Sequence, residues 1–139
     1  MRTDRHLEVL AVIATGGALG SLARLALTEA IPHSAQTAFP TATFVTNIAG
    51  CFAIGLLMTY VLTVGKPSRY TRPFLGTGVL GGFTTFSAYA VETRELLAAS
   101  AYATAAAYVV GTVIGCLLAV HTGIALARAA LHHIFRGRA

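Results

Sequence analysis

The stretch Gly76-Thr-Gly-Val-Leu-Gly-Gly-Phe-Thr-Thr-Phe-Ser-Ala-Tyr89 decides the fold of this chain. It carries no charge, which suits a membrane interior. Its centre, Gly81-Gly82 followed by Thr84-Thr85, is a poor helix, because a glycine costs about 1 kcal/mol relative to alanine. Irregular backbone at membrane depth is tolerated only inside protein or beside a water-filled cavity. We therefore predict a membrane helix broken near its middle, where free backbone groups can bind an ion. A close glycine crossing between two helices is the alternative explanation.

The composition of the chain is that of a membrane protein. Of its 139 residues, 55% are apolar and 11% are charged, and the mean hydropathy is +0.71. Soluble domains carry about 25% charged residues, so there is too little charge here to cover a soluble surface. A chain this apolar is not disordered, and two cysteines are too few for a disulfide-rich scaffold. The length allows one small domain, and we assign residues 1–139 to a single membrane domain.

Four long stretches of the sequence contain no charged residue. They are bounded by Glu8 and Arg24, Glu29 and Lys66, Arg72 and Glu92, and Glu95 and Arg128. A membrane-spanning helix needs about 20 predominantly apolar residues. The first stretch is long enough if Arg24 lies near the membrane boundary and its head group reaches outward. We predict an all-α membrane protein with helices at about residues 8–29, 41–65, 72–95 and 99–128.

Arginine and lysine are distributed unevenly over the two sides of these helices. Four spans place both termini on one side, and cytoplasmic loops carry the excess of arginine and lysine. We therefore predict a multi-pass protein of the cell inner (plasma) membrane with both termini cytoplasmic. The basic residues belong to short membrane flanks, which favours lipid headgroups as partners and excludes a nucleic-acid surface. The terminal side holds Arg2, Arg5, Lys66, Arg69, Arg72, Arg128, Arg136 and Arg138, and the other side holds Arg94, with Arg24 near it.

Polar and small residues recur every four positions in the second and fourth predicted helices. Steps of four follow one slowly drifting helix face, and a polar group inside a membrane faces protein or water. Each face is either a packing surface or a track for conduction or binding. Asn47 is the hardest to explain by packing, because an amide has four hydrogen-bonding valences. The residues are Thr43, Asn47, Cys51, Gly55 and Thr59 in the second helix and Thr104, Tyr108, Thr112 and Cys116 in the fourth.

The sequence has no catalytic or metal-ligating cluster with a recognisable spacing, so we predict no enzyme. Cys51 and Cys116 fall in mid-helix, where we expect small apolar residues rather than a disulfide. A proton-coupled transporter normally has an embedded ionisable residue, which weighs against a small multidrug-type secondary transporter, the main alternative function. The carboxylates near the membrane all sit close to the ends of predicted helices, at Glu8, Glu29, Glu92 and Glu95.

Three motifs make the chain similar to a known family. They are Gly16-Gly17…Gly20-x-x-x-Arg24, Thr43-x-x-x-Asn47-x-x-Gly50, and Gly81-Gly82-Phe83-Thr84-Thr85-Phe86-Ser87 with Glu92. The third motif is highly specific, and the first two support it. Over nearly its whole length the chain resembles the Fluc/CrcB family of fluoride channels. The resemblance implies passive export of fluoride that protects the cytoplasm from fluoride toxicity.

The resemblance also implies an architecture. Two four-helix subunits pack antiparallel into a dimer with two pores, and the third helix of each is broken near its centre. A structural sodium ion lies at the dimer interface on backbone carbonyls, which by position are those of Gly81 and Thr84.

The resemblance further implies a fluoride pathway of uncharged groups. Donors without charge and the positive edges of aromatic rings can replace the water around fluoride and still release the ion. Two positions depart from the family pattern: Tyr89 stands where a second phenylalanine is usual, and Ala88 where a small hydroxyl residue is usual. The pathway residues are Phe86, Tyr89, Asn47, Thr43, Tyr108, Thr112, Cys116 and Ser87, and Arg24 belongs to a vestibule.

The charge bias raises a question about the dimer partner. An antiparallel homodimer needs one sequence to insert in both orientations, which implies balanced arginine and lysine. In the family, some members work as pairs of distinct chains with opposite orientations. We therefore hypothesise that this chain pairs with an opposite-topology paralogue rather than with itself. A non-transporting membrane assembly protein is a third class of function, in which substitutions at Asn47 or Phe86 would alter stability alone.

Overall fold

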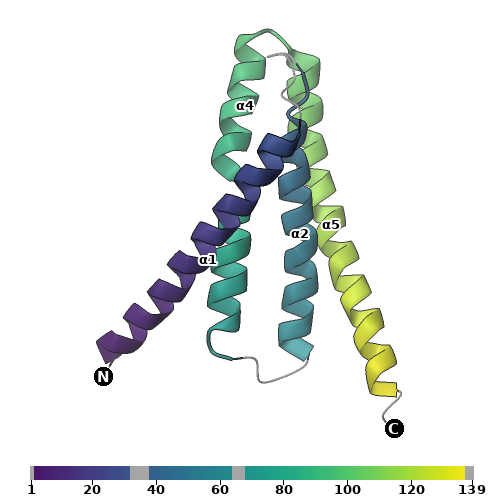
Figure 1. Ribbon diagram of the computed structural model, residues 1–139. Helices are drawn as coiled ribbons and strands as arrows, with labels where there is room; N and C mark the ends of the chain where they lie inside the picture. The colour runs from purple at the N-terminus through teal and green to yellow at the C-terminus, as the bar shows by residue number, and fades with distance from the viewer. Residues whose placement is uncertain (1, 32–37, 64–67, 137–139) are drawn as a thin grey trace.

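The computed structural model describes residues 2–31, 38–63 and 68–136, and the elements in these ranges are helices. In chain order they are α1 (Arg2–Ala30), α2 (Thr41–Thr63), the π-helix η1 (Arg72–Leu80), α3 (Gly81–Phe83), α4 (Phe86–Ala98) and α5 (Tyr102–Arg136) (Figure 1). Four segments are long and apolar enough to cross a membrane: Arg5–Ala30, Thr41–Thr63, Arg72–Ala98 and Tyr102–His133. This confirms the predicted all-helical membrane fold with four spans.

The helix ends differ from the predicted ones because charge marks the membrane boundary and not the end of a helix. The first helix begins at Arg2 rather than near residue 8, and the last continues to Arg136 rather than ending near residue 128. A charged helix can continue into water, where its backbone bonds stay within the segment. The predicted end of the second span at residue 65, and the basic residues Lys66 and Arg138, lie outside the described residues.

The turn between α4 and α5 moves the start of the last helix from the predicted 99 to Tyr102. Ser100 has a positive φ of 58°. Its amide donates to the Leu97 carbonyl at 3.1 Å, and the Ala101 amide donates to the Leu96 carbonyl at 2.9 Å. This is the Schellman arrangement that ends many helices. It closes α4 and reverses the chain within three residues.

Helices α2 and α5 pack with their backbones in contact. A methyl group built on Gly55 would overlap the Val120 carbonyl oxygen, and one on Gly123 would overlap the Phe52 carbonyl oxygen. Small residues allow this approach between membrane helices, where van der Waals packing drives association. The position of α2 relative to α5 is therefore fixed along the length that carries both polar faces.

A second glycine crossing joins α1 to the first half of the third span. A methyl group on Gly20 would overlap the Val79 carbonyl oxygen, and one on Gly82 would overlap the Gly17 carbonyl oxygen. The glycine crossing and the helix break, weighed above as alternatives, thus both occur in the same span. Residues 72–80 also widen into a π-helix, so that the Gly81 amide reaches the Gly76 carbonyl. The sequence reading missed this rare geometry, which is common at functional sites.

The start of α1, the end of α2, the start of η1 and the end of α5 lie at one end of the molecule (Figure 1). At this end the Glu8 carboxylate accepts hydrogen bonds from the Tyr70 hydroxyl, at 2.6 Å, and from the Arg69 guanidinium. The four-span topology therefore brings the chain ends and the loop before η1 to the same side. The buried core lies at the opposite end, where Leu96, Ala105 and Tyr108 pack together.

Candidate functional site

The third span is broken at two residues. Thr84 (φ −75°, ψ 158°) and Thr85 (φ −148°, ψ 125°) are extended, between α3 and α4. The Thr85 hydroxyl accepts a hydrogen bond from the Ala88 amide at 3.2 Å and so caps the start of α4. Threonine is a preferred residue at such a cap. The break is therefore held by its own sequence, and it falls where the glycine-rich stretch predicted it.

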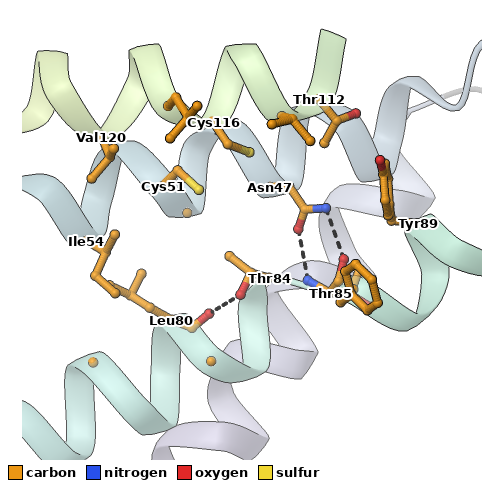
Figure 2. Close-up of a pocket in the computed structure, with 16 residues that line it drawn as sticks. Asn47, Cys51, Ile54, Leu80, Thr84, Thr85, Tyr89, Thr112, Cys116 and Val120 are labelled. Carbon is orange, nitrogen blue, oxygen red and sulfur yellow. Dashed lines mark hydrogen bonds between the residues drawn. The ribbon is translucent and has the colours of Figure 1, made fainter. Parts of the chain in front are cut away.

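Asn47 of α2 supplies partners for the backbone at the break. Its Nδ2 donates to the Thr85 carbonyl at 3.0 Å, and its Oδ1 accepts from the Thr85 amide at 2.9 Å (Figure 2). A buried backbone group without a partner costs about 1–3 kcal/mol, and no water replaces the partner in a membrane interior. The amide thus satisfies both polar groups of one residue, and one of its two hydrogens stays available.

Two of the hydrogen bonds at the break release two carbonyls from the helical ladder. In a continuous helix the Thr85 amide would bond the Gly81 carbonyl, and the Ala88 amide would bond the Thr84 carbonyl. Here the first amide donates to Asn47 and the second to the Thr85 hydroxyl. The released carbonyls belong to Gly81 and Thr84, the residues assigned to sodium on the family resemblance. Oxygen atoms of unwound backbone are ligands that sodium accepts, so the residues fit this ion.

A cavity of about 550 Å³ lies beside the break, between α2, α5 and the third span (Figure 2). Seven of the predicted site residues line it, and its lining includes no charged side chain. Thr112 of α5 is one of the lining residues: it is 6% exposed, and its hydroxyl oxygen is buried with no hydrogen-bond partner among the described residues. A buried polar group without a protein partner indicates a place for water or a ligand. The seven residues are Asn47, Gly81, Thr84, Phe86, Tyr89, Thr112 and Cys116.

One turn away, the same faces of α2 and α5 bind a carboxylate of α4. Thr43 Oγ1 donates to Glu92 Oε1 at 2.7 Å, and Tyr108 Oη donates to Glu92 Oε2 at 2.6 Å. Tyr108 is fully buried at 0% exposure. Because each hydroxyl has one hydrogen, both hydrogens are used within this cluster. Glu92 lies in the candidate third span, Arg72–Ala98, about two turns before its end, and it is half-buried where it meets α2 and α5.

Comparison with known proteins assigns the family. A family model described as "CrcB-like protein, Camphor Resistance (CrcB)" matches residues 11–124. The chain belongs to the CrcB family. Three similar proteins are named "Fluoride-specific ion channel FluC", with numbers in two of the names. The one from Nocardia farcinica is 45% identical over 120 residues, 86% of this chain and 85% of that protein.

The other two relatives differ in how much of their own length is matched. The Flavobacterium psychrophilum protein is 43% identical over 122 residues, which are 88% of this CrcB chain and 98% of the relative. The Streptomyces avermitilis protein is 46% identical over 123 residues, 88% of this chain, but the match spans only 60% of that relative's length. The resemblance to the Fluc/CrcB family that the motifs indicated is thereby confirmed.

The two aromatic positions of this CrcB chain have different surroundings. Phe86 is 78% exposed at the mouth of the cavity, whereas the Tyr89 ring packs against Tyr108 at 5.2 Å between ring centroids. The Tyr89 hydroxyl donates to the Val109 carbonyl at 3.3 Å. The hydroxyl that distinguishes this residue from phenylalanine is therefore bonded to α5 and does not project freely into the cavity.

The remaining predicted residues of the CrcB chain, Ser87 and Arg24, are not part of the cavity lining. The Ser87 hydroxyl is 3.2 Å from that of Thr85, and Arg24 lies half-buried in α1 with an Nε that has no partner in the described part of the chain. Thr85 was missed as a site residue. The cap preference of threonine after the glycine-rich run could have found it. In the described ranges, no group of three or more His, Cys, Asp or Glu is placed to hold a metal.

Proposed function

We propose that this CrcB chain forms a passive, fluoride-specific ion channel that exports fluoride and so limits its toxicity in the cytoplasm. It uses no nucleotide and performs no chemical step, in line with relatives named as ion channels. The observation that carries the proposal is the cavity beside the break, which offers neutral donors and no fixed cation. Conduction requires binding weak enough to release the ion, and a buried positive charge in the cavity would hold fluoride too strongly.

The proposed pathway follows the cavity wall. The unpartnered Thr112 hydroxyl and the free hydrogen of the Asn47 amide donate to fluoride, and the ring edges of Phe86 and Tyr89 face it. Cys116 continues the α5 wall, and Ser87 and Arg24 belong to the entrances. Thr43 and Tyr108 act differently from the expectation of direct donors, because their hydrogens go to Glu92. They position this carboxylate one turn from the ion path.

The released carbonyls of Gly81 and Thr84 support the proposed sodium site. A bound sodium ion supplies positive charge that attracts carbonyl dipoles and so holds broken helices together. Gly81 and Thr84, which carry these carbonyls, both line the cavity. In the proposed arrangement the ion is structural and takes no part in conduction.

The proposed assembly is an antiparallel dimer in the inner membrane. Support comes from Phe86, a pathway residue left exposed in the single chain, which a second subunit would cover. Arg5, Arg69, Arg72 and Arg128 lie at the end of the molecule that carries the termini, so we place that end in the cytoplasm. The excess of arginine and lysine on the side of the termini favours an opposite-topology paralogue as partner. A functional dimer of this chain alone, seen by crosslinking or native mass measurement, would refute that pairing.

The experiment is fluoride efflux from liposomes that contain the purified chain, with chloride as the control anion. Fast fluoride efflux without chloride efflux supports the channel and shows that the chain pairs with itself. If efflux appears only after an opposite-topology paralogue is added, the chain is one half of a channel. If fluoride efflux is seen neither with the chain alone nor with the paralogue added, the proposal is contradicted. Phe86→Ile should abolish fluoride efflux while the dimer survives, whereas in an assembly protein Phe86→Ile would alter stability alone.

One observation favours the small multidrug-type secondary transporter as a second candidate. Glu92 is a half-buried carboxylate within the candidate third span, and such proteins use a carboxylate within a span to couple transport to protons. The two functions separate when a proton gradient is imposed on the liposomes. A transporter would accumulate its substrate against a concentration gradient, and Glu92→Gln would abolish this accumulation. A channel equilibrates fluoride and never accumulates it above the value that the membrane potential sets.

A further inference from the structure

Cys51 and Cys116 are the two cysteines of the sequence, and fluoride conduction does not explain the presence of two thiols. They stand one helical turn beyond Asn47 in α2 and one turn beyond Thr112 in α5. Both are free and half-buried, and both line the cavity. Figure 2 shows the two side chains beside the same cavity, Cys51 on α2 and Cys116 on α5.

The backbone next to this thiol pair is held firmly. One turn further along, Gly55 of α2 lies against the Val120 carbonyl of α5, so close that a methyl group would overlap the oxygen. Gly123 of α5 lies equally close to the Phe52 carbonyl of α2. These contacts set the distance between the helices that carry the two sulfur atoms. A pair of ligands fixed in this way loses little freedom when it binds an ion.

The chemistry of the pair selects the ion. Thiolates prefer soft metals, and zinc in structural sites takes four ligands. In the described part of the chain no third His, Cys, Asp or Glu lies with the two thiols in a group that could hold a metal. The site therefore suits a metal that is stable with two sulfur ligands. Net charge inside a membrane is costly. Two thiolates and a doubly charged cation give a neutral complex, whereas a singly charged cation leaves a net negative charge.

We propose that Cys51 and Cys116 form a two-coordinate site for a divalent thiophilic metal cation between α2 and α5. On binding, each S–H bond breaks and one S–metal bond forms, and two protons leave to water through the open cavity. No electron is transferred, and the charge of the site stays at zero. The bound metal ties α2 to α5 and occupies the wall next to the Thr112 hydroxyl. A blocking effect on ion flux rests on the proposed channel function, but metal binding does not.

Mercuric ion is the probe, and the intact mass of the purified full-length chain is the first readout. We expect one mercury per chain with the loss of two protons. A monothiol such as 2-mercaptoethanol then competes for the metal. Because two linked ligands bind at least about 100-fold more tightly than one, Cys51→Ser and Cys116→Ser should each release mercury at a competitor concentration at least about 100-fold lower than the native chain.

Two results would overturn the site. One is two mercury ions on each native chain, one for each thiol, which needs no variant and so does not depend on how the variants fold. The other is a folded single-serine variant that holds mercury as tightly as the native chain does. In fluoride-conducting liposomes, mercury should block efflux of the native chain, and excess thiol should restore it. If no preparation conducts fluoride, the proposed function fails, while the mass and competition results still decide the metal site.

Discussion

Two neighbouring turns of the same pair of helices have opposite polar arrangements. In one turn Thr43 and Tyr108 donate their only hydroxyl hydrogens to Glu92, so this cluster is closed. In the next turn Asn47 bonds the break at Thr85, and the buried Thr112 hydroxyl is left without a partner in the described part of the chain. The residue types on α2 and α5 are similar in the two turns. The two turns differ in what packs against them. The Glu92 carboxylate of α4 accepts both hydroxyl hydrogens of one turn, whereas the extended backbone at Thr84 and Thr85 lies beside the other.

The largest effect is expected from Asn47→Ala, which removes the partner of the break. The Thr85 amide and carbonyl would both be left unsatisfied, at about 1–3 kcal/mol each. We expect a loss of about 2–6 kcal/mol in the stability of the detergent-solubilised protein, measured by its thermal unfolding. Thr59→Ala, on the same face of α2, is the control and should cost far less. Equal losses in the two variants would show that Asn47 is not what holds the break.

Glu92→Ala should have the next largest effect, because it removes the acceptor of the Thr43 and Tyr108 hydroxyls. Two hydroxyls lose a charged acceptor, and hydrogen bonds to charged groups contribute about 1.5–3 kcal/mol each. Because Glu92 is only half-buried, we expect destabilisation at the lower end of the sum for two bonds, about 3 kcal/mol. The loss should be smaller for Glu92→Gln, whose carbonyl oxygen still accepts one hydrogen bond. The same thermal unfolding assay orders the two variants. If Glu92→Gln proved as damaging as Glu92→Ala, the negative charge rather than the hydrogen bonds would be what matters.

The smallest effect is expected from Tyr89→Phe, at the edge between the two turns. Only the hydroxyl bond to the Val109 carbonyl is lost, and a neutral hydrogen bond contributes about 0.5–1.5 kcal/mol. Since the Val109 carbonyl is on a helix and retains its own helical partner, we expect destabilisation below about 1 kcal/mol and near-native fluoride efflux. A large fall in efflux for this variant would mean that the hydroxyl itself contacts the ion.

The broken span and the importance of Asn47 could be predicted from sequence because both follow from local chemistry. Gly81-Gly82 before Thr84-Thr85 is a poor helix at membrane depth, and an embedded amide must find partners. The role of Glu92 could not be predicted in this way. Glu92 accepts hydrogen bonds from Thr43 of α2 and Tyr108 of α5, and these contacts depend on how three helices pack rather than on the local sequence.

Other features depended on contacts that a sequence does not display. The π-helix over residues 72–80 packs against α1 through Gly16 and Gly20, and nothing in its own composition marks the wider turn. Cys51 and Cys116 line the same cavity because of how α2 and α5 cross. The sequence alone predicted two small apolar residues and could not show that they share a cavity. The helix ends at Arg2 and Arg136 were missed because charge ends a span without ending a helix.

The most direct measurement compares fluoride efflux from liposomes containing native protein, Thr112→Val and Thr112→Ser. Valine keeps the shape and removes the unpartnered hydroxyl, so stability should stay within about 1 kcal/mol of native. A lost hydrogen bond to an anion is worth about 1.5–3 kcal/mol, so fluoride efflux should fall by about 10- to 100-fold, while serine should restore most of it. Native efflux from folded Thr112→Val protein would contradict the account, because the open turn would then not be the place where fluoride is bound.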